Sequence, residues 1–342
     1  MNRADLQLIA ELSDPDRGVV EALSRMEGDL VVLGAGGKMG FNLALMAHRA
    51  FQEAGKANRV IAVSRFASDD QRQAFESEGI HTHRAELTDA AAVRDLPDAP
   101  NVLHLTGVKF GTGDNPGYTW LINVHEPALI AQRYCDSQII VLSSGNVYPL
   151  TSRGSGDVAG ATEDTPLNPV GEYGQTVVGR ERMFQHFSQQ HGTPVCVVRL
   201  NYAIEPRYGV LTDLARKVQR GEPIDLSMGY VNIVWTTDAN RVILKCFDLA
   251  TSPPKALNLT GPTVLSVREL ANQFADIFGS DPVFTGEESP TALLSDASEC
   301  WKRFGPPEAT LEYMVHRVAE WLMQGLPVWD KPTHFEVRSG QF

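Results

Sequence analysis

The stretch at residues 28–49 constrains the fold of this chain more than any other. It reads GDLVVLGAGGKMGFNLALMAHR, an apolar run at 30–33, then closely spaced glycines, then an apolar helical pattern. Strand, glycine turn and helix in this order build a dinucleotide pyrophosphate site, because glycine lets the backbone approach phosphate and the helix N-terminus attracts an anion. The predicted loop residues are Gly34, Gly36, Gly37, Lys38, Met39 and Gly40.

Similar apolar runs recur along the chain with helical patterns between them. They lie at 60–63, 102–105, 139–142 and 195–200. Continuous apolar strands separated by helices predict a parallel sheet covered on both faces, and right-handed crossovers make it a Rossmann-type doubly wound α/β fold.

After Asn201 the pattern is more mixed and predicts a smaller α/β lobe at the carboxyl ends of the strands, where ligands bind. The expected helices are 211–220, 238–249, 266–278 and 311–324, and the expected strands are 233–235 and 256–259.

The chain is predicted to have three parts. Residues 1–28 form an N-terminal helical extension of two short helices, which packs on the rest of the chain or forms an oligomer contact. Residues 29–202 and 232–250 form the dinucleotide-binding domain. Residues 203–231 and 251–342 form the substrate lobe and a tail that is expected to dock.

The net charge of −12 over 342 residues argues against a nucleic-acid or anionic-membrane partner, since both need clustered Lys and Arg. No apolar run approaches the ~20 residues of a membrane span, and no signal peptide is visible. The four cysteines are far apart, and His81 and His83 have no further ligand beside them, so we predict no metal site. A reduced, cytoplasmic protein is the expectation.

A second set of motifs follows the run at 139–142. Ser143-Ser144 precedes Val147-Tyr148, and Tyr173 stands near the start of a helical pattern. With the glycine turn, these motifs resemble the extended short-chain dehydrogenase/reductase family, which includes sugar epimerases and dehydratases. The likeness runs from about residue 30 to 324. The other motifs that carry it are His104–Gly107, Asn123-Val124, Arg199–Tyr202, Asp238 and Leu259–Pro262.

This resemblance implies roles for individual residues. Ser144 and Tyr173 would hold the reacting oxygen, and the tyrosine would act as acid or base during hydride transfer with a nicotinamide. The other implied cofactor residues are Ser64, Arg65, Leu87, Leu105, Thr106, Gly107 and Asn123. The implied substrate residues are Ser144, Asn146, Asn201, Tyr202 and Trp235. The family also implies a possible homodimer.

One departure from the family concerns catalysis. The pattern Tyr-x-x-x-Lys here ends in Val177, so the usual cation beside the tyrosine is missing. A tyrosine without a neighbouring cation is a poor base at neutral pH but still donates a proton to a carbonyl. Lys109 and Arg180 are the possible replacements. We favour Lys109, which follows the fourth strand, and add it to the catalytic residues.

Two further departures concern ligands. Val231 stands where nucleotide-sugar enzymes of the family carry a pyrophosphate-binding Arg, which favours a small substrate such as a free sugar, lactone or sugar acid. Arg207 or Arg241 could bind a carboxylate of such a substrate. Ser64 and Arg65, instead of an acid, end the second strand, which together with Lys38 favours NADP, with NAD as the alternative.

The sequence therefore predicts an NAD(P)-dependent oxidoreductase or epimerase of carbohydrate metabolism. A dehydratase is less favoured, since Gly145-Asn146 offers no carboxylate after Ser144. The loss of the lysine at Val177 keeps a second class open, a non-catalytic NAD(P)-binding sensor or scaffold.

Overall fold

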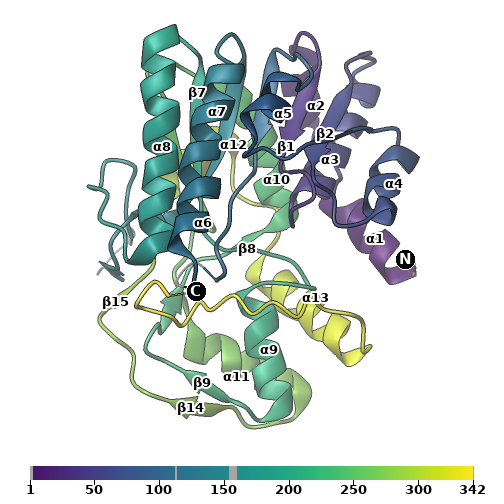
Figure 1. Cartoon of the computed structure of the whole chain (residues 1–342). Coiled ribbons are helices and arrows are strands. Elements are labelled where there is room, and N and C mark those ends of the chain that lie inside the picture. Colours follow the sequence, from purple (N-terminus) through teal and green to yellow (C-terminus); the bar gives the residue numbers. More distant parts are fainter. Residues whose placement is uncertain (1–2, 112–113, 154–159, 342) are drawn as a thin grey trace. The chain divides into compact units, whose positions relative to one another are not determined.

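The computed structural model describes residues 3–111, 114–153 and 160–341 (Figure 1). The chain divides into two compact units, which are described one at a time. The first comprises Met1–Ser144, Gln175–Arg199 and Asn240–Leu257, and the second comprises Gly145–Gly174, Leu200–Ala239 and Asn258–Phe342.

A seven-stranded sheet in the order β12-β7-β5-β4-β1-β2-β3 forms the core of the first unit. The pairs from β3 to β5 are parallel, with Leu30 opposite both Val60 and Asn101. The chain runs outward from β1 to β3 and returns beside β1 as β4, so the order reverses between β1 and β4. The predicted doubly wound Rossmann fold is confirmed. The strands are β1 (Leu30–Leu33), β2 (Val60–Ser64), β3 (His81–Arg84), β4 (Asn101–His104), β5 (Gln138–Ser144), β7 (Val195–Leu200) and β12 (Lys255–Leu259).

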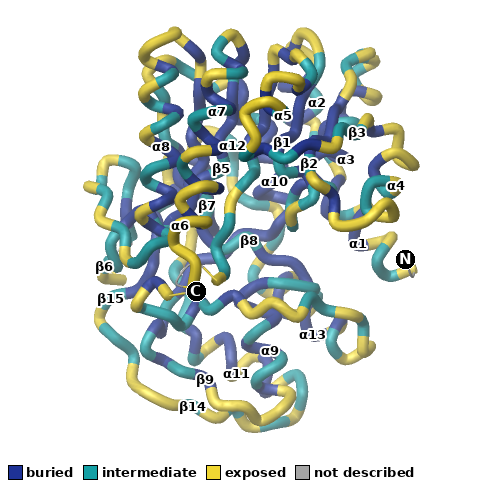
Figure 2. Tube along the Cα trace, viewed as in Figure 1, coloured by how far each residue is buried: buried dark blue, intermediate teal, exposed yellow. Residues whose placement is uncertain are grey.

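The central strands are buried on both faces. Every residue of β1 and β4 is buried, as continuous apolar runs require (Figure 2). Side chains such as Val31, Val102, Val141 and Phe184 join one core cluster. The helices are α3 (Gly40–Glu53), α4 (Asp69–Ser77), α5 (Ala90–Arg94), α6 (Pro116–Trp120), the π-helical turn η1 (Leu121–His125), α7 (Glu126–Arg133), α8 (Gly171–His191), α10 (Thr236–Lys245) and the 3-10 turn η3 (Cys246–Leu249).

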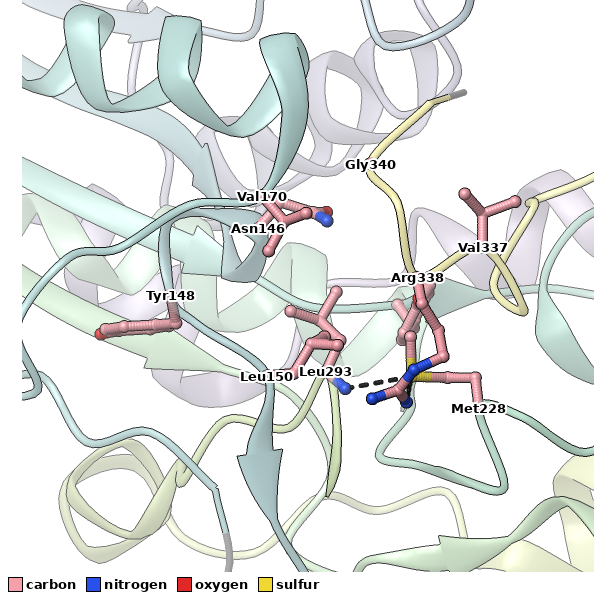
Figure 3. A pocket seen from close by; sticks show the side chains of 10 residues that line it. Asn146, Tyr148, Leu150, Val170, Met228, Leu293, Val337, Arg338 and Gly340 are labelled. Carbon is pink, nitrogen blue, oxygen red and sulfur yellow. Dashed lines mark hydrogen bonds between the residues drawn. The ribbon is translucent and has the colours of Figure 1, made fainter. Parts of the chain in front are cut away.

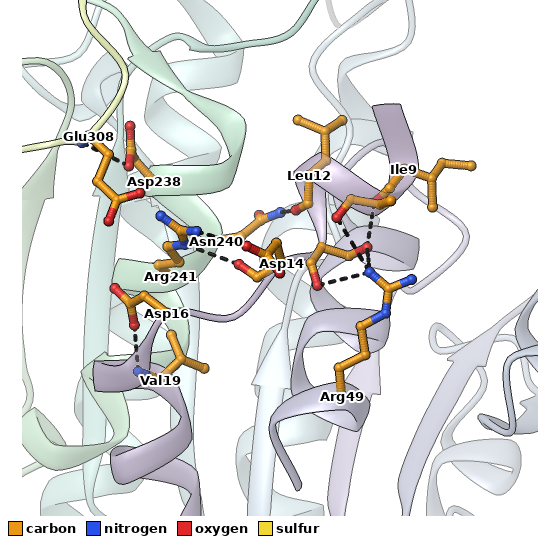
Figure 4. Close-up of polar contacts among 12 residues, drawn as sticks. Ile9, Leu12, Asp14, Asp16, Val19, Arg49, Asp238, Asn240, Arg241 and Glu308 are labelled. Atoms are coloured by element: carbon orange, nitrogen blue, oxygen red, sulfur yellow. Dashed lines mark hydrogen bonds and ion pairs between the residues drawn. The ribbon is translucent and has the colours of Figure 1, made fainter. Parts of the chain in front are cut away.

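The N-terminal extension forms the two predicted helices, α1 (Arg3–Leu12) and α2 (Arg17–Ser24). Asn240 donates a 3.0 Å hydrogen bond to the carbonyl of Leu12, and Arg241 Nε donates one of 3.0 Å to the carbonyl of Asp14 (Figure 4). Helix α10 thus holds the connection between α1 and α2, and the extension packs on its own chain.

The second unit is a mixture of helices and short strand pairs. Helix α9 packs on α11 and α13. The helices are α9 (Val210–Arg220), α11 (Val267–Phe278), α12 (Ser298–Phe304) and α13 (Leu311–Met323), and the strand pairs are β6 (Thr151–Ser152) with β15 (Thr291–Ala292), β8 (Ala203–Ile204) with β11 (Val234–Trp235), β9 (Pro223–Asp225) with β14 (Val283–Thr285), and β10 (Tyr230–Val231) with β13 (Leu265–Ser266).

The tail after α13 docks along α9, as expected from its composition. The Asp213 carboxylate accepts hydrogen bonds from the backbone N–H and the hydroxyl of Thr333, at 2.7 and 2.6 Å. Lys217 Nζ lies 3.3 Å from a carboxylate oxygen of Glu336. Phe335, between these contacts, is buried. Ionic and apolar contacts therefore fix residues 333–336 on one helix.

Candidate active site

The glycine turn lies where β1, β2 and β4 end. Gly34 has φ +76°, and a Cβ there would stand 2.8 Å from the backbone nitrogen of Thr106. A Cβ on Gly36 would stand 2.5 Å from Ser64 Oγ. Gly34 and Thr106 are therefore in contact where the strand order reverses between β1 and β4, the position at which doubly wound sheets bind ligands, and Gly36 is in contact with Ser64 at the end of β2.

The turn passes directly into helix α3. A Cβ on Gly40 would overlap the carbonyl of Ala35, so only glycine lets the helix start this close to the turn. Met39, at the N-cap, makes no side-chain capping hydrogen bond. The first amides of α3 thus suit an anion, and the bare backbone of Gly36 and Gly37 suits a pyrophosphate. The residues present fit a dinucleotide.

Cations surround this turn. Lys38 Nζ lies 4.8 Å from the ring centre of Phe110, and Lys109 Nζ lies 5.6 Å from the same ring. Arg65, which follows β2, is 3.4 Å from the carboxylate of Glu86. A side-chain hydrogen bond with Tyr118 raises the pKa of the Arg65 guanidinium. Glu86 is a carboxylate that the sequence analysis did not consider, and it competes with any ligand phosphate for Arg65.

Asn123 is fully buried, and its side-chain amide is hydrogen-bonded to residues of two different segments. Its oxygen accepts hydrogen bonds from the Val108 N–H and from Arg180 Nη2, both at 2.9 Å. Its nitrogen donates to the Val108 carbonyl and the Thr176 hydroxyl, both at 2.9 Å. These bonds use the full capacity of the amide, so Asn123 joins the segment after β4 to helix α8.

Arg180 lies deep in the first unit with its guanidinium against Gly107. A Cβ on Gly107 would overlap Arg180 Nη2, and Arg180 Nη1 donates to the Leu142 carbonyl at 2.8 Å. The guanidinium thus touches a predicted cofactor residue at the end of β4. Val177, three residues earlier, is fully buried.

Helix α8 is also held by a buried ion pair. Glu181 accepts hydrogen bonds from Arg199 Nε and Nη2 at 3.0 and 2.8 Å and from Ser143 Oγ at 2.5 Å. The two charged side chains are each 8% exposed. Ser143 precedes Ser144 on β5, so this network fixes the strand that ends in the predicted catalytic serine.

Two cavities are lined by predicted substrate residues of the second unit. Asn146 and Tyr202 line one cavity (Figure 3), whereas Trp235 lines a different one of about 300 Å³ and packs edge-on against Tyr313. Asn201 is buried and donates to Asn232 at 3.0 Å.

Tyr173 lies in the first turn of α8, in the second unit. Burial raises the pKa of Tyr208, with smaller contributions from Asp213 and Tyr173, so the phenols of Tyr173 and Tyr208 are within electrostatic reach of each other. A Cβ on Gly174 would stand 2.6 Å from the Asn146 carbonyl oxygen, so the start of α8 packs closely on the segment after Ser144.

The arginines considered for a substrate anion have other partners. Arg207 forms a bidentate pair with Glu205, at 2.9 and 3.0 Å. Arg241 binds Asp14 through its carbonyl and carboxylate. Val231, in the place of the family's pyrophosphate-binding Arg, is fully buried.

The comparison with family models decides the identity. Residues 30–248 match the model described as the NAD dependent epimerase/dehydratase family. The chain belongs to this family. It is therefore an enzyme of the short-chain dehydrogenase type, as the sequence motifs predict. In sequence, no curated protein matches the chain.

Solved structures share the fold at low identity. The chain is similar to MoeE5, solved with UDP-glucose and NAD (TM-score 0.68, 19% identity, 87% of this chain and 99% of that one). It is also similar to DesIV, the dTDP-glucose 4,6-dehydratase of Streptomyces venezuelae, solved with NAD and TYD (TM-score 0.70, 16% identity, 86% and 97%). A third is the UDP-glucuronic acid 4-epimerase of Bacillus cereus with NAD (TM-score 0.67, 16% identity, 86% and 99%).

Two other predictions concern membranes and metals. No helix in the described ranges has the length and apolar character needed to cross a bilayer. Within the same ranges, no three His, Cys, Asp or Glu side chains are grouped so that they could hold a metal ion.

Sequence reasoning missed two features of the site. It ranked Arg180 behind Lys109, which follows the fourth strand. The contact of Arg180 with Gly107 depends on how α8 lies on the sheet, which no local pattern reveals. Glu86 was missed because it follows a polar strand whose exposed residues carry no motif.

Proposed function

We propose that this enzyme transfers hydride between NAD(P) and a small carbohydrate-type substrate, as an oxidoreductase or an epimerase. The observation that carries the proposal is the glycine turn, in which Gly34, Gly36 and Gly40 have no room for a side chain at the strand reversal. A bound nicotinamide dinucleotide supplies the hydride acceptor or donor. Ser144 and Tyr173 are proposed to hold the reacting oxygen and to manage its proton.

The missing lysine makes the source of positive charge the main question of the mechanism. Arg180 is fixed by Asn123 and Leu142 against Gly107, and Lys109 lies on the Phe110 ring. We propose that Arg180 supplies a permanent charge beside the cofactor segment. Lys109, on the loop after β4, is proposed to add a second positive charge whose position is less fixed than that of Arg180.

Changing Lys109 to alanine should lower turnover or cofactor affinity about tenfold, as expected for the loss of one partly buried charge contact of about 1.4 kcal/mol. Steady-state kinetics and cofactor titration measure the two effects. The control is Arg303→Gln, which removes an exposed charge from α12. If both quantities are unchanged in the Lys109 variant, Lys109 has no part in the site.

We propose NADP as the preferred cofactor, with NAD as the alternative. Lys38 and Arg65 flank the turn, and Ser64 provides a hydroxyl beside Gly36. Calorimetric titration with both nucleotides should give tighter binding of NADP, and Arg65→Gln should reduce that preference. Tighter binding of NAD by the unaltered protein would mean that Glu86 controls Arg65 and that the NADP assignment is wrong.

A small substrate is proposed because Val231 offers no pyrophosphate contact and Arg207 is paired with Glu205. The test is oxidation of NADPH, or NADH, by keto sugars and lactones, followed by nicotinamide absorbance. Turnover supports the enzyme. Tight cofactor binding without turnover of any of these compounds would show that the substrate belongs to another class. A cytoplasmic homodimer stays a prediction from the sequence and the family resemblance.

A further inference from the structure

Arg338 belongs to the docked tail and lines the same cavity as Asn146 and Tyr202 (Figure 3). The cavity is also lined by Val170, three residues before Tyr173, and by Gly340. The backbones at Gly340 and Gly171 touch, because a Cβ on either would overlap the other segment. The tail therefore forms one wall of a cavity in the second unit, which Asn146 and Val170 also line.

The guanidinium of Arg338 is only partly used by the chain. Nη1 donates to the carbonyls of Ser227 (3.0 Å) and Thr291 (2.6 Å), with the sulfur of Met228 at 3.7 Å, and Nη2 donates to the Thr291 hydroxyl (2.7 Å). A guanidinium has five N–H donors. In the described part of the chain, the Nε–H and the second Nη2–H have no acceptor. These two form the planar fork that binds a carboxylate through two parallel hydrogen bonds.

The charge of Arg338 is also not balanced locally. Among the described residues, no carboxylate lies within ion-pair distance of it, and Glu336, two residues earlier in the chain, pairs with Lys217. A half-buried cation held by neutral carbonyl and hydroxyl groups favours an anion from outside the chain.

The size of the cavity limits that anion. Its volume is about 10 Å³, which holds about one water molecule. The space admits no more than the tip of a ligand, whose remainder lies outside. This limit favours a planar carboxylate over the bulkier phosphate, although the fork itself can bind either group.

We propose that Arg338 recognises the carboxylate of a sugar-acid substrate through its Nε–Nη2 edge, as a specificity-determining residue contributed by the tail. This inference rests on the proposed function for the position of the sugar. The role of Arg338 in binding is nevertheless measured without turnover. A failure of the Arg338 proposal can therefore be distinguished from a failure of the proposed function.

The experiment is calorimetric titration of the full-length protein, with and without NADP, using D-gluconate and D-glucuronate as carboxylate probes. D-Glucose is the neutral probe, and glucose 6-phosphate is the phosphate probe. The carboxylates should bind more tightly than glucose. Arg338→Gln should lower their affinity about 100-fold or more, the value of two charge-assisted hydrogen bonds, without changing glucose or NADP binding.

Two further variants separate recognition from folding. Arg338→Lys keeps the charge and loses the fork, so it should show a smaller loss than Arg338→Gln even if the latter destabilises the tail. Arg303→Gln should change no affinity. The proposal is overturned if neither carboxylate binds, if glucose and gluconate affinities fall together, or if glucose 6-phosphate binds more tightly than gluconate. A failure of NADP to bind would instead count against the proposed function.

Discussion

Replacing Tyr173 by phenylalanine is expected to lower kcat by about 10²- to 10⁴-fold, the usual contribution of a positioned acid or base. The change removes the hydroxyl that is proposed to exchange a proton with the substrate oxygen and keeps the ring. Steady-state kinetics with the best keto sugar measures the loss.

The start of α8 explains why the effect should fall on the reaction and not on folding. Gly171 has φ +76°, and Gly174 packs on the Asn146 carbonyl, so the backbone that carries Tyr173 is fixed by contacts that do not involve the phenol. The free energy of unfolding should therefore change little. Tyr313→Phe, on the exposed face of α13, is the matched control. If Tyr173→Phe retains turnover within about twofold, another group manages the proton.

Local sequence patterns were sufficient to predict most of the strands and helices of the first unit. The predicted strand at 30–33 is β1, and the predicted strand at 195–200 is β7, because buried parallel strands are continuous apolar runs. Helix α11 begins after Ser266, which caps it as the sequence suggests. The expected helix at 238–249 is instead α10 followed by a 3-10 turn from Cys246. Such ends depend on packing more than on periodicity.

Long-range contacts explain what the sequence did not show. The strand expected at 256–259 is β12, which lies beside β7 at the edge of the large sheet. Its pairing partner could not be read from its own residues. The contacts of Arg338 were also not predictable from the local sequence, because its partners Ser227 and Thr291 are more than forty residues away. The glycine turn was predictable because its strand, turn and helix are contiguous.

Breaking the buried pair of helix α8 should have the largest effect on stability. Glu181→Leu is expected to lower the free energy of unfolding by about 3–5 kcal/mol, because it removes the carboxylate that balances the buried Arg199 charge. Ser143 loses its acceptor in the same variant. Equilibrium unfolding in urea measures the change. Because Ser143 precedes Ser144 and Glu181 lies on the helix of Tyr173, turnover should fall as well.

Two controls make this result specific. Glu21→Gln removes the acid of the exposed Arg17–Glu21 pair, whose side chains are 92% and 56% exposed, and should cost less than about 1 kcal/mol. The double variant Glu181→Leu with Arg199→Met replaces both charges by apolar groups and should recover most of the lost stability, since two well-packed apolar side chains need no counter-charge. A double variant as unstable as Glu181→Leu would show that the bond to Ser143, not the ion pair, holds α8 on the sheet.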